Sequence, residues 1–375
     1  MRIGFLQRSF ASPHSGEVGS RMEFGGIVRA VRCGGVAIIA LYLIGGLTDP
    51  GWAQQTSTSP DVGPSRFTLL EENDSLYFNS DKHYTQGFRL SDLIGGSPAP
   101  GGLWDGMFDL LSIGPLFEPG GTRKTAILAG QSIFTPKNLA LKPPDPKDRP
   151  YAGWIYGGVS MLQEAPDKRM LENFEIDFGM VGPGALGQLA QNTFHQFIGA
   201  QQAQGWSSQI QHEFGGMVNY ERLWRFPLFG DNSLGVDVVP ELGATAGNIF
   251  TYGSAGGMLR LGKGLQADYG PVRVRPALSG TDYFDEAGLD NGSGWYLFVG
   301  TQGRVVGRNI FLDGNSFRPS RSVPKKPLVA DFETGVSINW SQSVRLDVAV
   351  MQRTKEFYGQ PSDDVLGTAA LTFSW

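Results

Sequence analysis

The sequence predicts an all-β protein, a transmembrane antiparallel β-barrel of about 12 strands with a short amphipathic helix in one loop region. Three observations indicate this fold. Apolar and polar residues alternate along strands of about nine to eleven residues. No segment after residue 53 approaches the roughly 18 uninterrupted apolar residues of a membrane-spanning helix. The chain also ends on a strand that finishes at Trp375, with no helical tail.

The composition excludes several classes of protein. The chain has 375 residues, of which 18% are charged, with 53 glycines and a formal charge of −5. Because there is no basic excess, we expect no nucleic-acid partner. The one cysteine is Cys33, in the N-terminal segment, so the rest of the chain builds neither disulfides nor thiolate metal sites.

Residues 1–53 are predicted to be a cleaved signal peptide, and residues 54–375 a single outer-membrane barrel domain. Two arginines precede an apolar run at residues 36–47, and Ala53 is a suitable last residue before cleavage. This run fits the apolar core of a signal and is too short to span a bilayer comfortably. Two alternatives stay open, namely a short membrane anchor and Met22 as the true start.

The early part of the barrel is expected to contain short strands and polar loops. Residues 67–70 and 88–91 are expected strands that flank a polar corner. Glycine and proline predict a loop at residues 92–122. A strand at residues 123–134 and a Pro- and Lys-rich loop at residues 135–150 follow.

Later strands show the alternation most clearly, for example at residues 173–181, 335–340 and 343–350. Their polar faces carry charges that cost several kcal/mol each when buried unpaired. A barrel lumen avoids this cost, so we expect these charges to face it; a secreted β-sandwich is the alternative. The charges are Glu175, Asp177, Arg345 and Asp347.

Residues 184–200 break the strand pattern, because apolar side chains recur there at helical spacing. The apolar positions are Leu186, Ala190, Phe194, Phe197 and Ile198. The opposite face carries Gln188, Gln191, Asn192 and His195. We expect the apolar face to pack against the protein, so that the polar face presents an imidazole beside amides.

Polar chemistry is concentrated at residues 71–74 and 81–87, which gather acidic groups, an amide, an imidazole and a hydroxyl. Loops held by rigid strands are favoured places for catalytic groups, although the stretch alone favours a solvated hairpin loop. The basic residues at 135–150 are expected to be solvated, with phosphate binding as the alternative. These are Lys137, Lys142, Lys147 and Arg149.

Several motifs together resemble the lipid A 3'-O-deacylase family of Gram-negative outer membranes. They lie at residues 72–74, 81–87, 148–154 and 182–195, supported by Trp206, Gln209, Glu213 and residues 312–315. The likeness covers roughly residues 66–375. It implies a twelve-stranded barrel that depends on calcium and hydrolyses the 3'-linked acyloxyacyl chain of lipid A. The implied partners are lipopolysaccharide as substrate and the outer-membrane bilayer, with the protein a monomer.

The resemblance also implies a set of site residues. The family's essential groups are an Asn-Asp pair, a Thr in a Y-T-x-G motif and a His reached through Q-x-x-x-H. By this likeness the residues are Asn73, Asp74, Thr85, Gln191 and His195. One departure is Gln86, where an Asn is common; the similar amide changes little.

Ester hydrolysis needs a nucleophile, a base and a donor to the oxyanion. His195 is the natural base, because an imidazole titrates near neutrality, and Gln191 lies one helical turn away to orient it. Asp74 offers the hard oxygen that calcium prefers, Asn73 a donor to the oxyanion, and Thr85 a group that positions water or binds the metal.

The nucleophile is expected to be water. Ser75 is the alternative, because residues 73–76 superficially resemble a serine hydrolase block. No Gly-x-Ser-x-Gly elbow occurs in the chain, which disfavours a soluble serine esterase.

Two other functions stay open. An outer-membrane phospholipase is expected to carry a Ser near its catalytic His, whereas Gln196 and Phe197 follow His195 here. A non-enzymatic porin or structural barrel would need no polar-faced helix. His83 and His212 are expected to be surface or interface histidines. Aromatic anchors at the membrane interface are expected at Tyr84, Trp154, Trp340 and Trp375.

Overall fold

The computed structural model describes residues 63–375, except residues 75–81, 115, 232, 277–280 and 290. The predicted signal peptide at residues 1–53 and the candidate nucleophile Ser75 therefore lie outside the described residues.

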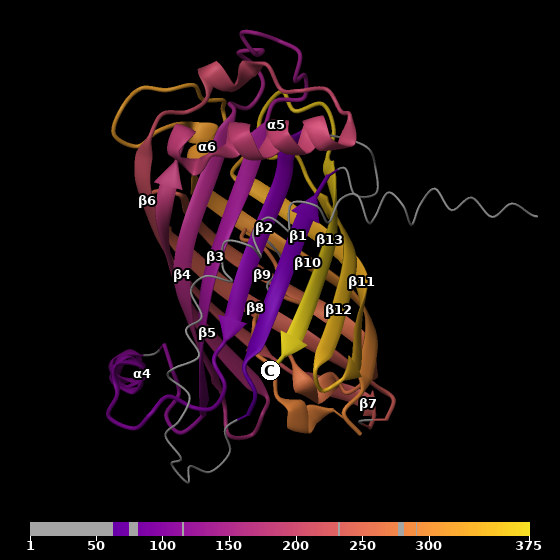
Figure 1. Cartoon of the computed structure of the whole chain (residues 1–375). Helices are drawn as coiled ribbons and strands as arrows, with labels where there is room; N and C mark the ends of the chain where they lie inside the picture. Colours follow the sequence, from indigo (N-terminus) through magenta and orange to yellow (C-terminus); the bar gives the residue numbers. More distant parts are fainter. Residues whose placement is uncertain (1–62, 75–81, 115, 232, 277–280, 290) are drawn as a thin grey trace, which may run out of the picture. The chain divides into compact units, whose positions relative to one another are not determined.

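The described chain is built from strands with a few short helices (Figure 1). The strands are β1 (Arg66–Asn73), β2 (His83–Leu93), β3 (Thr122–Thr135), β4 (Ala152–Glu164), β5 (Met170–Val181), β6 (Glu213–Trp224), β7 (Phe226–Gly230), β8 (Gly235–Gly247), β9 (Phe250–Lys263), β10 (Gly294–Asn309), β11 (Leu328–Ser341), β12 (Val344–Arg353) and β13 (Asp364–Ser374). The α-helices are α4 (Leu103–Ile113), α5 (Gly187–Ile198) and α6 (Ile310–Asp313). Single 3-10 turns lie at Pro183–Ala185, Gly205–Ser208, Leu265–Ala267 and Glu286–Gly288. Within the part of the chain that the structure describes, no helix is long and apolar enough to span a lipid bilayer.

The strands form one closed antiparallel barrel. Neighbours in sequence pair around the ring, and β1 pairs with β13 to close it. Of the 13 strands in the sheet, β6 and β7 are two parts of one strand, because only Arg225 separates them and both pair with β8. The wall therefore has twelve strands, which confirms the predicted fold and excludes the β-sandwich.

Side chains alternate between the lumen and the outside of the wall, as period-two patterning requires. In β10, Tyr296 and Phe298 are buried, while Leu297 and Val299 are 51% and 57% exposed. The charges predicted to face the lumen are all buried: Glu175, Asp177, Arg345 and Asp347.

The two ends of the barrel differ. The start of β1 and the end of β13 lie at one end of the barrel, where Ser65 N donates to Trp375 O at 3.1 Å. At the same end, residues 165–169 form a short turn between β4 and β5. Residues 182–212, with α5, and residues 310–327, with α6, lie at the other end (Figure 1). Because outer-membrane barrels have short periplasmic turns and longer outer loops, these are here called the periplasmic and extracellular ends.

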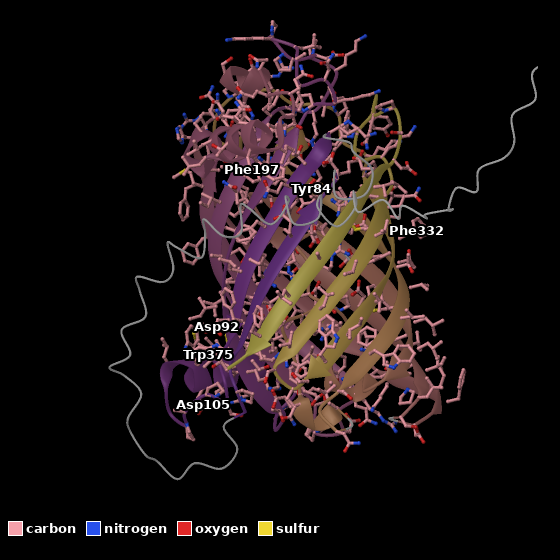
Figure 2. All side chains as sticks on the ribbon, turned by 45° about the vertical axis from the view of Figure 1, so that its right-hand side comes forward. Tyr84, Asp92, Asp105, Phe197, Phe332 and Trp375 are labelled. Atoms are coloured by element: carbon pink, nitrogen blue, oxygen red, sulfur yellow. The ribbon has the colours of Figure 1, made fainter. Side chains whose placement is uncertain are left out.

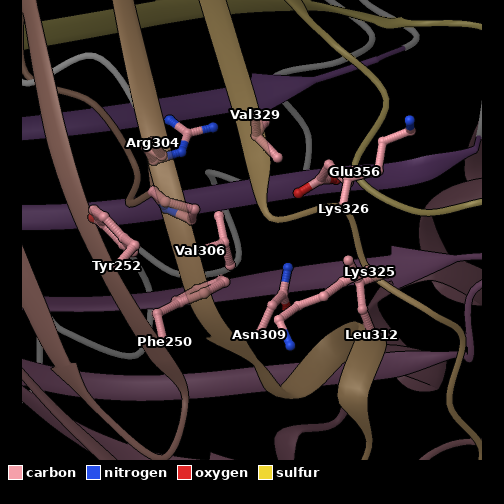
Figure 3. Close-up of a pocket in the computed structure, with 11 residues that line it drawn as sticks. Phe250, Tyr252, Arg304, Val306, Asn309, Leu312, Lys325, Lys326, Val329 and Glu356 are labelled. Carbon is pink, nitrogen blue, oxygen red and sulfur yellow. The ribbon is translucent and has the colours of Figure 1, made fainter.

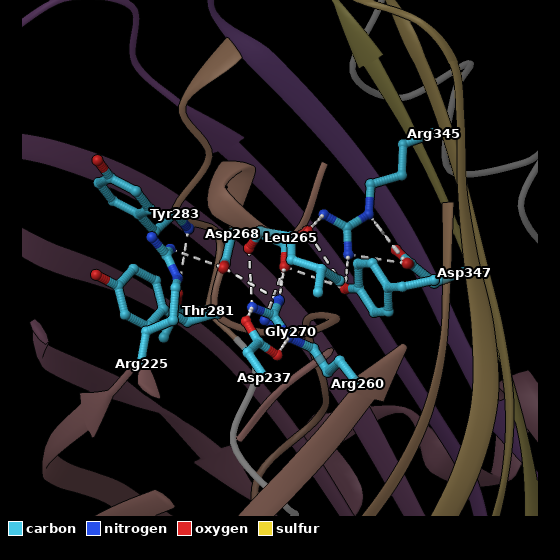
Figure 4. Close-up of polar contacts among 12 residues, drawn as sticks. Arg225, Asp237, Arg260, Leu265, Asp268, Gly270, Thr281, Tyr283, Arg345 and Asp347 are labelled. Carbon is cyan, nitrogen blue, oxygen red and sulfur yellow. Dashed lines mark hydrogen bonds and ion pairs between the residues drawn. The ribbon is translucent and has the colours of Figure 1, made fainter. Parts of the chain in front are cut away.

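Two described parts of the connection between β9 and β10, residues 264–276 and 281–289, fold into the lumen and are together called the plug. Arg225, which interrupts the β6–β7 strand, donates to the plug carbonyl of Asp268 at 2.9 Å. Figure 4 shows how Asp268 also joins Arg260 and Arg345. The plug's polar contacts reach strands on all sides of the ring: Arg273 with Glu72 of β1, Tyr283 with Glu164 of β4, Arg275 with Glu221 of β6, and Asp268 with Arg345 of β12.

The predicted loop at residues 92–122 is wrong in its middle, where α4 forms. Apart from Gly106, the glycines and prolines lie on the flanks of this segment, while Leu103, Met107 and Leu111 recur every four residues. The helix turns Phe108 to the barrel, so tertiary packing stabilises it between flanks that break regular structure.

Two of the four predicted interface aromatics are inside the barrel. Tyr84 and Trp154 are 3% and 2% exposed, and Tyr84 donates to Glu72 at 3.1 Å. Trp340 and Trp375 are 58% and 75% exposed on the outside, as interface anchors require. Composition did not separate the two pairs, because both faces of a barrel strand accept aromatic residues.

Candidate active site on the outer wall of the barrel

A cleft of about 860 Å³ lies at the extracellular end, between the outer side of β1–β2 and helix α5. Glu72 faces the lumen, where it pairs with Arg273 of the plug. The next residue along the strand, Asn73, therefore faces outward. The cleft brings together every residue predicted to carry the chemistry: Asn73, Asp74, Thr85, Gln191 and His195.

The strand register places two polar side chains of β2 in the cleft. Asn73 pairs directly with Gln86 across β1 and β2. The β2–β3 register shifts between Tyr84 and Gln86, which makes Thr85 a bulge residue. A bulge re-aims side chains, so Thr85 and Gln86 both line the cleft while Tyr84 points inward. The hydroxyls of Thr85 and Thr135 lie 2.7 Å apart and share a hydrogen bond.

Close packing of two glycines sets the position of α5. A Cβ on Gly187 would lie 2.7 Å from the Trp206 ring, and one on Gly153 would lie 3.0 Å from Ala185. The first turn of the helix therefore rests directly on β4. On β3, Gln131 donates its side-chain amide to the Ala185 carbonyl at 2.6 Å.

The orientation of α5 is only partly as predicted: Ala190 packs against the barrel, but two of the expected outward polar residues are buried. Gln191 and His195 are 2% and 5% exposed, whereas Leu189 and Phe197 are 63% and 65% exposed. Figure 2 shows Phe197 at this upper part of the barrel. Gln191 and His195 cover the cleft, and Phe194 and Ile198 of the apolar face line it as well. Leu186 and Phe197 point away from the barrel, where lipid rather than protein forms the apolar surroundings of this wall.

Hydrogen bonding fixes the tautomer of His195. Its Nδ1 lies 2.5 Å from the carbonyl oxygen of Gln201, which can only accept, so Nδ1 carries the proton. In the neutral ring Nε2 is then the basic nitrogen. The turn that returns Gln201 to the imidazole depends on Gly199, whose φ of 71° suits glycine.

Gln191 is held by a buried indole. Trp206 Nε1 donates to Gln191 Oε1 at 2.8 Å, and Trp206 packs on Tyr151 with ring centroids 5.0 Å apart. Trp206 thereby fixes the direction of the Gln191 carboxamide one helical turn before His195.

Asp74 closes the β1 side of the cleft and is 2% exposed. Lys82 N donates to Asp74 Oδ2 at 2.5 Å. Among the described residues, no three of His, Cys, Asp and Glu are grouped for a metal ion. The oxygen donors that line the cleft are one carboxylate, one hydroxyl and several amides. Such a set suits calcium, whose shell main-chain oxygens, water or substrate can complete.

Comparison with known proteins identifies the family. The family model of outer membrane protein LpxR matches residues 37–375. The chain belongs to the LpxR family. This confirms the resemblance to the outer-membrane lipid A 3'-O-deacylase family and places the protein in the Gram-negative outer membrane. No curated protein sequence matches the chain.

The fold is similar to that of a solved LpxR structure. LpxR from Salmonella typhimurium has a TM-score of 0.65 at 21% identity, covering 83% of this chain and 100% of that one. The COG4313 outer membrane channel from Pseudomonas putida F1 has a TM-score of 0.40 at 9% identity, covering 88% and 100%. The beta domain of the Bordetella autotransporter BrkA has a TM-score of 0.39 at 11% identity, covering 84% and 100%.

In this LpxR-family barrel, His83 is not the surface or interface histidine that we expected. It is fully buried, with Nδ1 2.7 Å from Asp364 and Nε2 3.6 Å from Asp148. The imidazole thus links the extracellular ends of β2 and β13 to the connection between β3 and β4. Burial raises the pKa of Asp148, but the nearby His83 imidazole and the hydrogen bond from the Lys137 backbone lower it, and the pKa of Asp148 lies below its usual range.

His212 is exposed, and its Nδ1 accepts a hydrogen bond from Gly184 N at 3.2 Å. Its neighbour Glu213, one of the supporting family motifs, receives hydrogen bonds from Asn315 and Ser316. These contacts tie the connection after α6 to β6. Glu213 therefore stabilises the extracellular rim and does not line the cleft.

The basic loop at residues 135–150 divides into two kinds of residue. Arg149 is fully buried, pairs with Glu356 at 3.1 Å and lies over the Phe134 ring, so it is not solvated as expected. Lys142 and Lys147 are exposed as expected. Lys137 is exposed but lines the cleft, a role that the sequence alone did not single out from the other lysines of the loop.

Another pocket of the LpxR-family barrel is too small for a lipid. It lies inside the extracellular end, beside Arg304, Asn309 and Lys325 (Figure 3), and has a volume of about 10 Å³. This is room for about one water molecule. The outer cleft is therefore the better candidate for the binding of a substrate.

Proposed function

We propose that this protein is a lipid A deacylase that hydrolyses the 3'-linked acyloxyacyl ester, with His195 as general base for water. The observation that carries the proposal is an imidazole in a polar cleft on the outside of an LpxR-family barrel. A lipid in the outer leaflet reaches such a cleft sideways, without entering the lumen.

The outer face of α5 supports this route. Leu186, Leu189 and Phe197 are all more than half exposed on the side away from the barrel. Acyl chains contact these residues, while the polar head of the lipid meets the cleft beside them. Lys137 brings an ammonium to the cleft lining, where it attracts the anionic phosphates of lipid A.

The proton moves through His195. With Nδ1 held by the Gln201 carbonyl, Nε2 accepts the proton of the attacking water and returns it to the leaving alkoxide. The Asn73 amide donates to the oxyanion that forms on the ester carbonyl. Trp206 holds Gln191, and Gln191 in turn keeps the side of the cleft next to His195 polar.

Calcium is the proposed cofactor. Asp74 and Thr85 would hold it, with the remaining oxygens from amides, main chain, water and substrate. When bound, the ion supplies positive charge for the ester carbonyl and the lipid phosphates. The oxygen-rich lining of the cleft supports this assignment.

Two observations disfavour the alternatives. No serine is among the described residues that line the cleft, whereas an outer-membrane phospholipase is expected to use one beside its histidine. The plug and its ion pairs occupy the lumen, which is unsuited to a general porin.

The test is mass spectrometry of lipid A from Gram-negative cells that express the chain or its His195→Ala variant. The intact chain should yield lipid A that lacks the 3'-linked acyloxyacyl group, and the variant should leave it in place. A phospholipid hydrolysis assay on the same membranes identifies the phospholipase alternative. Unchanged lipid A with the intact, folded barrel would contradict the proposal.

A further inference from the structure

Helix α4 packs on the outside of the barrel, at the periplasmic end. Phe108 stacks on Phe117 at 5.4 Å between ring centroids, and both pack on Met161 of β4. Leu162, the next residue of β4, packs with the plug in the lumen, so Met161 faces outward. Figure 2 shows Asp105 of α4 at the same end of the barrel as Trp375.

The segment after α4 covers a charged pair on the outer wall. Glu172 of β5 follows Leu171, which packs with the plug, so Glu172 faces outward. It pairs with Arg222 at 2.5 Å and accepts a hydrogen bond from Glu118 N at 2.8 Å. Glu172 is nevertheless 1% exposed. Without this segment, the charged pair on the outer wall would be exposed to lipid.

The other face of α4 carries large apolar side chains with no protein cover. Leu103, Leu110 and Ile113 are 75%, 67% and 83% exposed. They lie seven and three residues apart, with Gly106 between the first two, and so form one stripe along the helix. The two acidic residues of α4, Asp105 and Asp109, both pair with Arg123 at 2.8 Å, which neutralises one of their two charges.

We propose that this stripe contacts the acyl chains of phospholipids in the periplasmic leaflet of the outer membrane. The argument is continuity with the lipid-facing wall. Phe229 of β7 and Trp375 are 68% and 75% exposed at the same end, so other apolar side chains of the outer surface lie at this rim of the barrel. An amphipathic helix with one apolar face lies in the interface in this way. The inference does not depend on the proposed catalytic function.

Cysteine labelling can test the contact directly. The one cysteine, Cys33, lies in the predicted signal peptide, so a single cysteine added to the mature barrel can be labelled alone. Leu110→Cys and Ile113→Cys probe the stripe, and Ser97→Cys, an exposed position before the helix, is the matched control. Each refolded barrel is labelled with an environment-sensitive fluorophore in phosphatidylcholine vesicles that contain nitroxide-labelled lipid.

We expect labels at positions 110 and 113 to emit at shorter wavelength than the label at 97. Their quenching by lipid nitroxide should be at least about twofold stronger, and their quenching by aqueous iodide weaker. Strong iodide quenching at 110 and 113 in a folded barrel would overturn the proposal. Protection from both quenchers would also overturn it, because a protein partner would then cover the stripe. The shift between heated and unheated samples on gels verifies folding for each variant.

Discussion

Helices α4 and α5 are two amphipathic helices on the outside of one barrel, and they bury opposite kinds of side chain. At the periplasmic end, α4 buries Phe108 against apolar residues of the wall. At the extracellular end, α5 buries Gln191 and His195 over a polar cleft. Both leave leucines exposed on the side away from the barrel.

The difference between the helices shows that the wall beneath each one decides its role. A helix in a lipid environment has apolar surroundings on its outer side in any case, so its inner face is free to be polar. Where strand β1, the bulge at Thr85 and Lys137 form a polar cleft, the helix encloses chemistry. Where Met161 lies on the wall and Phe117 of the connection after α4 packs on it, the helix completes an apolar surface.

The largest expected effect is the loss of activity at the α5 end when calcium is removed. Chelation should abolish hydrolysis and added calcium should restore it, since Asp74 and Thr85 are the proposed ligands. Asp74→Ala should be inactive or less dependent on calcium, with the barrel still folded. Deacylation of purified lipopolysaccharide measures this. Full activity after exhaustive chelation would show that protein groups alone stabilise the oxyanion.

His195→Ala should reduce deacylation by at least about two orders of magnitude, the range typical of a general base. The rate of the intact protein should rise with pH over the range in which an imidazole loses its proton. His212→Ala is the matched control, because His212 is exposed and outside the cleft lining. His83→Ala is unsuitable as a control, since His83 is buried between two carboxylates.

Ser75→Ala separates water from serine as the nucleophile. With water attacking, this variant should keep its activity in the same deacylation assay. A complete loss in a folded barrel would instead identify Ser75 as the nucleophile.

Trp206→Phe should lower the deacylation rate by about three- to tenfold, the worth of one hydrogen bond. The phenyl ring keeps the packing on Tyr151 but cannot donate to Gln191. We expect the loss in kcat rather than in KM, because the substitution affects the positioning of the cleft and leaves its lining unchanged. An unchanged kcat would mean that Gln191 needs no support from the indole.

Acid should weaken the extracellular connections through Asp148. Its pKa is lowered in the folded protein, so its contribution to stability is complete above the ordinary pKa of about 3.9 and is lost as pH falls below it. On gels, the intact protein should therefore unfold at a higher temperature than Asp148→Asn at pH 6. The difference between the two unfolding temperatures should be smaller at pH 3. If the difference in unfolding temperature were the same at both pH values, the stabilisation by Asp148 would not depend on its charge.

The smallest effect is expected at the α4 end. Asp109 is 66% exposed where it pairs with Arg123, and such surface pairs contribute at most about 1 kcal/mol. Asp109→Asn should leave both the unfolding temperature and deacylation nearly unchanged. A marked drop in deacylation would mean that the two ends of the barrel are coupled.

Much of the fold was predictable because strand alternation is a local property. The strands predicted at residues 123–134 and 173–181 are β3 and the main part of β5. The plug was not predicted, because charges such as Arg273 and Asp268 acquire partners from strands far away in the sequence, namely Glu72 and Arg345. Arg149 was misjudged for the same reason, since Glu356 lies 207 residues away.

The sequence, through its resemblance to the lipid A deacylase family, indicated which side chains meet at the candidate site. The spacing in each motif put Asn73 beside Asp74 and Gln191 one turn before His195, and these residues do line one cleft. Only the tertiary structure decided that the cleft lies outside the wall and that α5 turns its polar face inward. The physical reason is that periodicity separates an apolar face from a polar one, while the surroundings of each face depend on where lipid, protein and water lie around the barrel.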